Sequence, residues 1–237
     1  TVYVNDGTVV VNRQFTATVT AVNDAPVITS TVDSTANEDE LYSYTITASD
    51  VDGNTLTYAA PTIPSWLSFN ASTRVLSGTP LNANVGDTTV VLTVTDDGEG
   101  TLQDSQTFTI SVSNTNDTPV LLEIANPDTV LEDGENIVLT IAPTDEDAGA
   151  SLEVSVIAID GSLFPDSVIT VSPATGGSGD VRTITMNPPD NQNGESLVTV
   201  YVNDGTVVVN RQFTATVTAV NDAPVITSTV DSTANED

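Results

Sequence analysis

Acidic residues recur in this sequence in short groups, usually with Asn or Gly beside them. Asp-x-Asp, Asp-Gly and Asn-Asp pairs appear in the same order in two successive segments. Carboxylate and amide oxygens are ligands of hard divalent cations, and calcium accepts about six to eight of them in a flexible geometry that suits this set better than magnesium does. The sequence has no His and no Cys, which excludes zinc and other metals that prefer softer ligands. The pattern therefore predicts calcium sites.

The predicted elements bring these groups together at one end of each domain. In a sandwich of seven antiparallel strands, the loops after the second and the sixth strand lie at the same end, beside the linker that enters the domain. We expect the first junction to contain Asn23, Asp24, Asp50, Asp52 and Asp97. We expect the second junction to contain Asn116, Asp117, Asp145, Asp147 and Asp204, with Glu38 and Asp39 approaching from the preceding domain.

Electrostatic repulsion makes a cation necessary in such a group. Two carboxylates about 4 Å apart repel each other by about 4 kcal/mol at the effective dielectric of a protein surface. The residues from Asp50 onward resemble the start of an EF-hand loop, but Pro61 stands where that loop needs a bidentate Glu. The surrounding segments also predict strands and not helices, so we expect the cations at the ends of sandwiches.

Two levels of repetition define the domains. Thr1–Asp39 and Thr199–Asp237 are identical at every position, with a period of 199 − 1 = 198 residues, which predicts a tandem array copied from one unit. A shorter Asn-Asp-x-Pro motif ends at Pro26, Pro119 and Pro224, in steps of 119 − 26 = 93 and 224 − 119 = 105 residues. We expect the final hairpin of a preceding domain in 1–22, complete domains in 23–117 and 118–222, and the first strand of a further repeat in 223–237.

Strand patterns dominate between the turns. Segments rich in Val, Thr and Ile alternate with Asp-Gly and Pro-rich turns, and no segment has a helical period. About seven short strands in each hundred residues predict an all-β chain of tandem seven-stranded antiparallel Ig/cadherin-like sandwiches in a linear array. The predicted strands include 42–48, 89–95 and 107–112 in the first domain, and 137–141, 152–157, 168–171 and 182–186 in the second.

Composition narrows the class of protein. Asp and Glu number 33 against four Arg, and the formal net charge is −29, so the chain repels nucleic acid and anionic membranes and attracts cations. The sequence has no apolar run long enough to span a bilayer. Without His, Lys or Cys it lacks the usual groups for proton transfer near neutral pH, so we expect no enzyme. Trp66 is expected in the core, and the four Arg side chains are expected to pair with nearby acids.

At this point the motifs resemble a known family. The Asn-Asp-x-Pro linkers, the Glu-Asp pair before strand two, the Asp-x-Asp pair after it and the Asp-Gly pair after strand six resemble the interdomain calcium ligands of cadherin repeats. The resemblance adds a third junction, whose upper half is Glu132, Asp133, Asn221 and Asp222. It departs from that family at Ala21, Asn114 and Ala219, where the linker of cadherins begins with an acid, which implies fewer ions at each junction.

A second resemblance covers residues 26–117. Pro64-Ser65-Trp66-Leu67-Ser68-Phe69, followed by Leu76-Ser77-Gly78-Thr79-Pro80, resembles the dystroglycan-type cadherin-like or "Putative Ig" domains of bacterial surface proteins. The second domain is more loosely similar to the cadherin-like extender domains of giant bacterial adhesins.

The two resemblances together imply a secreted, cell-surface spacer. We expect Ca²⁺ to stiffen the joints of a long adhesin or fibre, with neighbouring identical repeats of the same chain as the main partners and other copies as partners in a fibre. We expect no contact with nucleic acid or with the membrane itself. One alternative is a module that binds a carbohydrate or a protein. Another is a subunit of an extracellular filament whose chains associate laterally or end to end.

Overall fold

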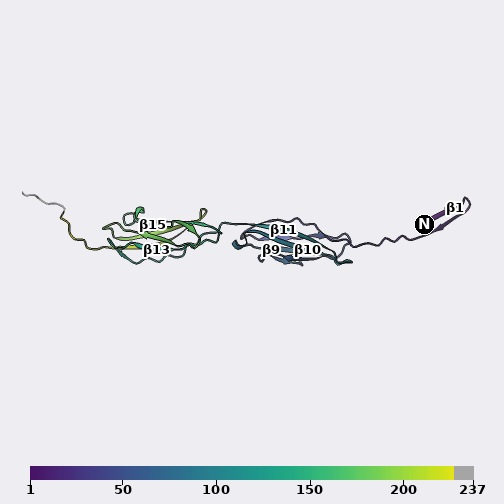
Figure 1. The fold of residues 1–237 in the computed structure, drawn as a ribbon, viewed down its shortest axis with the longest axis horizontal. Coiled ribbons are helices and arrows are strands. Elements are labelled where there is room, and N and C mark those ends of the chain that lie inside the picture. Colours follow the sequence, from purple (N-terminus) through teal and green to yellow (C-terminus); the bar gives the residue numbers. More distant parts are fainter. Residues whose placement is uncertain (227–237) are drawn as a thin grey trace, which may run out of the picture. The chain divides into compact units, whose positions relative to one another are not determined.

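The chain is all-β, as the sequence predicts. A computed structural model describes residues 1–226, which form strands, turns and two short 3₁₀ helices. The chain divides into two compact units, Thr1–Thr115 and Asn116–Asp237, and each contains a β-sandwich (Figure 1). In the predicted first strand of a further repeat, residues 223–226 have no regular structure, and residues 227–237 lie outside the described part. No helix within residues 1–226 has the length and apolar character needed to cross a membrane.

The sandwich of the first unit has one large sheet, one smaller sheet and a short strand pair. The large sheet has the order β4 (Thr35–Asn37), β11 (Gln103–Ser113), β10 (Gly86–Thr95), β7 (Thr57–Thr62). The smaller sheet has the order β5 (Tyr42–Thr45), β9 (Val75–Gly78), β8 (Ser68–Asn70), while β3 (Val27–Ile28) pairs with β6 (Ala48–Ser49) and η1 spans Asn82–Asn84. The nine strands occupy seven positions if β3 and β4 are counted as one position, and β5 and β6 as another.

The core of the first unit follows from two-residue alternation. Val90, Leu92 and Val94 on β10 are buried, whereas the residues between them are less buried, as expected when successive side chains point to opposite faces of a sheet. Tyr42 and Tyr44 contribute from the facing sheet. The ring of Trp66 packs against this core and meets the ring of Tyr42 edge to face at 6.1 Å, so the predicted core role of Trp66 is confirmed.

The second unit repeats this plan with a different sequence. Its larger sheet has the order β12 (Val130–Leu131), β19 (Val208–Thr218), β18 (Gly194–Asn203), β14 (Ser151–Ala158), β16 (Thr175–Gly177). Its smaller sheet has the order β13 (Ile137–Ile141), β17 (Arg182–Met186), β15 (Ile169–Ser172), and η2 spans Asp166–Val168. Figure 1 shows β13 and β15 in this unit. The predicted strands 137–141 and 182–186 coincide with β13 and β17.

Arg182 is an exception among the core residues. Its side chain is fully buried, and its Nε and Nη1 atoms have no hydrogen-bond partner, while Nη2 donates to the carbonyl of Gly177 at 3.4 Å. A Cβ atom on Gly176 would lie 2.6 Å from Nη2, so the guanidinium packs directly over Gly176 and would have to shift to admit a side chain there. The structure shows no acid paired with Arg182 among the described residues, contrary to the sequence-based expectation.

Residues 1–13 form a hairpin, here called the first hairpin, and residues 14–22 follow it without regular structure. Its strands are β1 (Val2–Asn5) and β2 (Val10–Arg13), and its turn is stabilised by the side chain of Asp6, which accepts from the backbone N–H groups of Thr8 and Val9. Gly7 adopts a φ of 95° in this turn, a conformation that favours glycine.

Tyr42 gives a pH-dependent test of the first sandwich. Burial, helped by the charge of Asp33 and by Tyr44, raises the pKa of Tyr42 from 10.0 to about 12. Because the folded state favours the protonated phenol, its contribution to stability is complete below pH 10 and is lost as the pH rises toward 12. Chemical unfolding of the first unit should therefore show falling stability across this window, and Tyr42→Phe should reduce that fall. Tyr3→Phe, at an exposed site, is the control, and an unchanged pH dependence in Tyr42→Phe contradicts the assignment.

Arg182 gives a test of the second sandwich. A buried polar group without a partner costs about 1–3 kcal/mol, and buried charges can be replaced by apolar groups of similar volume with a gain in stability. Arg182→Met should therefore raise the free energy of unfolding of the second unit by about 1–3 kcal/mol in denaturant titrations. Exposed Arg211→Met should change it by less than about 0.5 kcal/mol. A loss of stability in Arg182→Met would mean that the guanidinium is satisfied.

Candidate metal centre

The linker that enters the first sandwich is bonded to two of its loops. The backbone N–H of Asp24 donates to Oδ2 of Asp52 at 2.8 Å, and Nδ2 of Asn23 donates to Oδ2 of Asp96 at 3.1 Å. Nδ2 of Asn54 donates to Oδ1 of Asn23. The structure thus brings Asn23 and Asp24 of the linker to Asp52 on the loop after β6, as the sequence predicts, and to Asp96 on the loop after β10.

Asp50 organises the loop after β6. Its Oδ1 accepts from the backbone N–H groups of Asp52 at 2.9 Å and Asn54 at 3.3 Å. Its Oδ2 is buried and has no hydrogen-bond partner. A buried carboxylate oxygen normally finds a donor, so this unpartnered atom is a candidate ligand for a cation.

The second sandwich reproduces this arrangement. The backbone N–H of Asp117 donates to Oδ2 of Asp147 at 2.9 Å, and the N–H of Asp147 donates to Oδ1 of Asp145 at 2.8 Å. Oδ2 of Asp145 is again buried without a partner. Asp117 and Asp147 each offer a carboxylate oxygen, and these oxygens lie within 4.8 Å of one another. Nδ2 of Asn116 donates to Oδ2 of Asp204 at 3.0 Å, so all five predicted residues belong to one bonded group.

The electrostatics of this group are unfavourable without a cation. Burial raises the pKa of Asp145, and the charges of Asp147 and Asp204 raise it further. Hydrogen bonds from the backbone, first from Val207, lower the pKa of Asp204 and keep that carboxyl ionised. The ionised carboxylate of Asp204 therefore lies near Asp145, whose own negative charge is disfavoured. A bound cation would reduce the repulsion between them.

Asp96 belongs to the first group, although it is not among the residues predicted from the sequence. The side chain of Asn23 bonds to Asp96 in the first unit, as that of Asn116 bonds to Asp204 in the second. Asp97 lies next to this position, and its Oδ1 accepts from the backbone N–H of Thr55 at 2.7 Å, which lowers its pKa. Val90, Leu92 and Val94 are buried at every second position, and one further step of this alternation makes Asp96 buried as well. The two-residue alternation of the sequence could therefore have identified Asp96.

The Glu-Asp pairs at the opposite ends of the sandwiches fix the start of the next linker. Glu38 is buried, its backbone N–H donates to the carbonyl of Ser113, and its Oε2 accepts from the N–H of Thr115 at 3.3 Å. In the second unit, Glu132 is buried and its Oε1 accepts from the N–H of Val220 at 2.8 Å. In both units, the Glu side chain therefore holds the residue that immediately precedes an Asn-Asp pair.

The acids after these Glu residues have left-handed backbone conformations. Asp39 has a φ of 60° and Asp133 a φ of 59°, and Asp is one of the few residues that tolerate this region. The N–H of Asp39 donates to the carbonyl of Pro80, and Oδ1 of Asp133 accepts from the N–H of Asn191. Asn221 and Asp222, the predicted ligands after the second sandwich, are exposed, and the side chain of Asn221 donates to the carbonyl of Asp222 at 3.2 Å.

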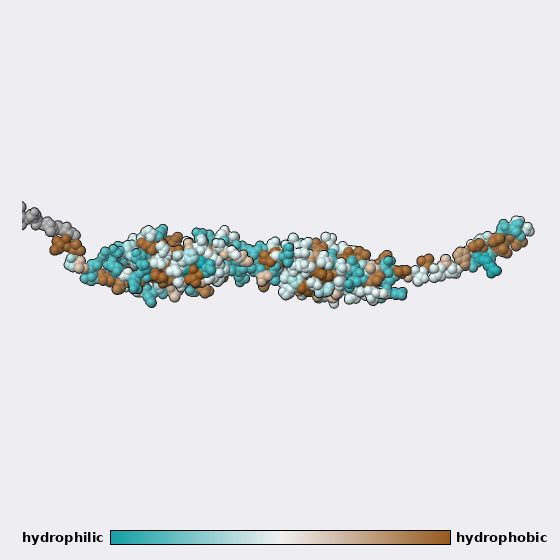
Figure 2. Space-filling model, in the orientation of Figure 1, coloured by the Kyte–Doolittle hydropathy of each residue, from teal (hydrophilic) through white to brown (hydrophobic). Residues whose placement is uncertain are grey.

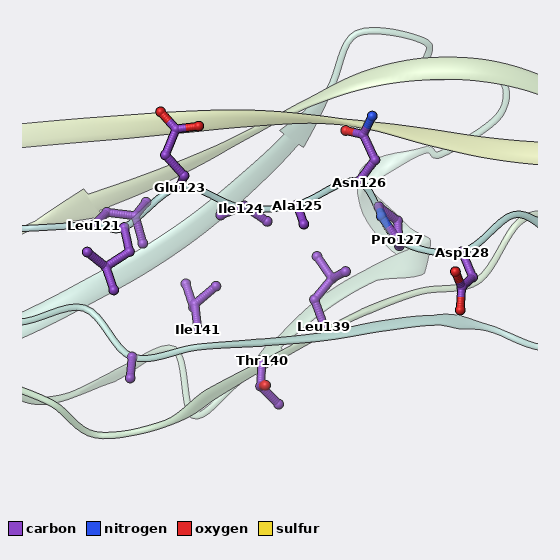
Figure 3. Close-up of a pocket in the computed structure, with 12 residues that line it drawn as sticks. Leu121, Glu123, Ile124, Ala125, Asn126, Pro127, Asp128, Leu139, Thr140 and Ile141 are labelled. Carbon is purple, nitrogen blue, oxygen red and sulfur yellow. The ribbon is translucent and has the colours of Figure 1, made fainter.

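A separate hollow lies on the second sandwich, away from the acidic groups. It has a volume of about 540 Å³ and lies between the segment 121–128 and β13. In Figure 3, Leu139 and Ile141 point toward that segment, whereas Glu123 and Asn126 point to its other side.

Comparisons with known proteins agree with this fold. A family model described as Putative Ig domain matches residues 25–113, which covers the first sandwich. No curated protein matches the chain. Among solved structures, the extracellular cadherin domains 1–5 of Protocadherin Gamma B2 match with a TM-score of 0.55 and 20% identity, over 85% of this chain and 42% of that one.

Two further structures give the same result. The extracellular domain of Protocadherin GammaB4 matches with a TM-score of 0.51 and 21% identity, over 83% of this chain and 35% of that one. Domains 3–6 of Protocadherin Gamma B2 match with a TM-score of 0.50 and 19% identity, over 84% of this chain and 54% of that one. This chain therefore has an Ig/cadherin-like fold and spans a third to about half of the length of these proteins.

Gly98 gives a test of how tightly the first acidic group is packed. A Cβ atom on Gly98 would overlap the side-chain amides of Asn23 and Asn54, so Gly98→Ala must displace them. We expect a loss of about 1–3 kcal/mol in the stability of the first unit, measured by denaturant unfolding. The matched control is Gly161→Ala, another Asp-Gly turn, where a Cβ would meet no atom within 4 Å. Equal effects of the two substitutions would show that the group around Asn23 is loose.

Proposed function

We propose that the chain is a spacer segment of a long, repetitive extracellular protein, in which Ca²⁺ bound at each linker fixes the angle between successive sandwiches. One observation carries the proposal. Two sandwiches of different sequence hold the same arrangement of linker N–H, Asp-x-Asp pair and buried carboxylate oxygen without a partner, at Asp50 and at Asp145. If these acids only helped a single sandwich to fold, the same arrangement would not be needed in a second sandwich of different sequence.

The ligand chemistry supports calcium. The groups offer Asp carboxylates, Asn amide oxygens and backbone carbonyls, all hard oxygen donors. The chain has a net charge of −29 and no His or Cys, so no softer ligand competes. When bound, the cation would supply the positive charge that the carboxylates at the end of each sandwich lack.

Covalent geometry supports a junction site. Thr115 is bonded to Glu38, and the next two residues, Asn116 and Asp117, are bonded to Asp204 and Asp147. Two residues of extended chain span at most about 7 Å. We therefore propose that Glu38 and Asp39 complete the ligand set of the second sandwich. By the same pattern, Glu132 and Asp133 with Asn221 and Asp222 would serve a following domain.

The expected energy favours a mechanical role for the ion. At about ten times its dissociation constant, a ligand stabilises the folded state by only about 1.4 kcal/mol, which is small beside the stability of a domain but enough to restrict a two-residue joint. Strands of about seven to ten residues give about 40 Å for each domain with its loops. Repeated copies would thus extend an adhesin or surface fibre away from the cell, with neighbouring repeats as the principal partners.

Chelation gives the direct test of stiffening. X-ray scattering of the 237-residue chain should show a larger maximum dimension and a narrower distance distribution in millimolar Ca²⁺ than in excess EDTA, because an unfixed joint samples bent arrangements. Glu38→Gln with Asp147→Asn should behave in Ca²⁺ as the unaltered chain behaves in EDTA. An identical distribution in Ca²⁺ and EDTA would refute the stiffening role, whatever the sandwiches themselves do.

Charge removal at the two buried carboxylates gives a second test. Asp50→Asn and Asp145→Asn keep the Oδ1 acceptor but remove the charge, so without calcium they should not lower, and should slightly raise, the melting temperature. In millimolar Ca²⁺ each should lose the calcium-dependent rise of its own unit, about 1.4 kcal/mol at tenfold saturation. Glu153→Gln, an exposed acid on β14, should retain the full rise. A normal calcium response in Asp50→Asn and Asp145→Asn would exclude these residues as ligands.

A further inference from the structure

The hollow on the second sandwich lies where the two sandwiches differ at one equivalent position. Tyr44 on β5 and Leu139 on β13 each lie six residues before the first Asp of the Asp-x-Asp loop, since 50 − 44 = 6 and 145 − 139 = 6. Both face inward, because the residues two positions before and after each of them are buried. Leu139 is therefore the counterpart of Tyr44.

In the first sandwich, an aromatic ring closes this position. Tyr44 is 6% exposed, and its ring meets that of Phe108 edge to face at 5.8 Å. Its hydroxyl oxygen lies 2.6 Å from Oγ of Ser30, on the segment between β3 and β4, and donates to Oε1 of Gln106 at 2.7 Å. The backbone N–H of Ser30 also donates to the carbonyl of Thr47 at 3.3 Å. The ring and these bonds hold the segment against the neighbouring strand.

The second sandwich lacks this closure. Leu139 is shorter than Tyr44 and only half-buried. Among the described residues, no backbone hydrogen bond joins the segment 121–128 to β13. The hollow of about 540 Å³ lies between that segment and β13, with Leu139 pointing into it (Figure 3). The space that a ring fills in the first sandwich is therefore open in the second.

The lining of the hollow is mainly apolar, and its charged residues are acidic. Leu121, Leu139 and Ile141 lie along it, and its two charged side chains are those of Glu123 and Asp128. On the face of the second sandwich that Figure 2 shows, apolar residues are scattered among polar ones, which is ordinary for a protein surface. The lining contains no aromatic side chain on which a sugar ring could stack. An apolar group with a positive charge nearby is therefore a better fit than a carbohydrate.

β13 adds backbone groups to this site. It lies at the edge of its sheet and pairs, among the described strands, with β17 alone, so its other edge presents N–H and C=O groups to which a further strand can bond. Its five residues, Ile137–Ile141, have the length of a short extended peptide, about 17 Å. Peptides that add to a sheet edge gain affinity from such main-chain bonds and specificity from pockets for their side chains.

We propose that the second sandwich binds an extended peptide along the free edge of β13, with an aromatic side chain of the peptide in the hollow and basic residues beside it. The ring takes the place that Tyr44 fills in the first sandwich. The basic residues complement Glu123, Asp128 and the net charge of −29. The site lies apart from the linkers and needs no calcium, so its failure leaves the proposed stiffening role standing, and the reverse also holds.

Titration of the full chain with short peptides tests the site. In EDTA, a capped pentapeptide of sequence Lys-Thr-Tyr-Thr-Lys should shift the amide NMR resonances of β13 and of residues 121–128. Replacing its Tyr by Ala should weaken binding at least about tenfold, because the buried ring is lost. Replacing both Lys by Glu should weaken it at least about tenfold at low salt. The Ala peptide also measures the general attraction of an acidic chain for Lys.

Three results of this titration would overturn the proposal. The Lys-Thr-Tyr-Thr-Lys peptide could leave the resonances of β13 and residues 121–128 unchanged, the Ala peptide could bind as tightly, or the Glu peptide could bind as tightly. The first result would mean that the hollow takes no peptide, the second that it does not select a ring, and the third that its acids do not select basic neighbours.

Filling the hollow tests where the ring binds. Leu139→Tyr places in the second sandwich the side chain that the first sandwich has at Tyr44, so it should weaken binding of the Lys-Thr-Tyr-Thr-Lys peptide at least about tenfold. Val138→Tyr, at the exposed neighbouring position on the opposite face of β13, is the matched control and should bind as the unaltered chain does. Undiminished binding by Leu139→Tyr would overturn the proposal.

Charge reversal tests the same site without altering the core. Glu123 and Asp128 are exposed, so Glu123→Lys with Asp128→Lys should leave the sandwich folded. The double variant should reduce the preference for the Lys peptide over the Glu peptide at least about fivefold at low salt. Glu153→Lys, which changes an exposed acid on β14, should leave that preference nearly unchanged. A preference that the double variant does not reduce more than Glu153→Lys does would overturn the proposal.

Discussion

Repulsion between carboxylates held close together at the end of each sandwich is the constraint around which the linkers are built. The acids cannot separate, because backbone N–H groups of the linker and of the Asp-x-Asp loop donate to Asp52, Asp50, Asp147 and Asp145. These bonds satisfy Oδ1 of Asp50 and of Asp145, and leave Oδ2 of each residue buried without a hydrogen-bond partner. The loops therefore hold the acids close together, at a cost in repulsion that a bound cation would offset.

The linker connects this constraint to the opposite end of the preceding sandwich. Glu38 and Glu132 are buried and receive the N–H of the residue just before each Asn-Asp pair. The linker therefore begins on a buried carboxylate of one domain, and the next two residues bond to loops of the following domain. A two-residue linker has few free torsions, so the ion proposed above would restrict it more than it would a long, flexible linker.

Much of this could be read from the sequence, and the exceptions have definite causes. Strand patterns locate β13 and β17 to the residue, because alternation and turn residues agree there. The Asp-Gly motif directs attention to Asp97, whereas the alternation of β10 places Asp96 on the inner face. Arg182 was expected to find an acid, but two-residue alternation on β17 places it inside, where the described structure offers it a carbonyl. In both cases strand register outweighs the local motif.

The duplicated hairpin separates what the local sequence determines from what the sandwich adds. The turn and four residue pairs are the same in both copies, so Asn-Asp-Gly-Thr and the flanking Val residues determine the register by themselves. β2 ends at Arg13, whereas β19 continues to Thr218, because its later residues pair with Gly194–Val198 of β18 and with β12, all outside the duplicated segment.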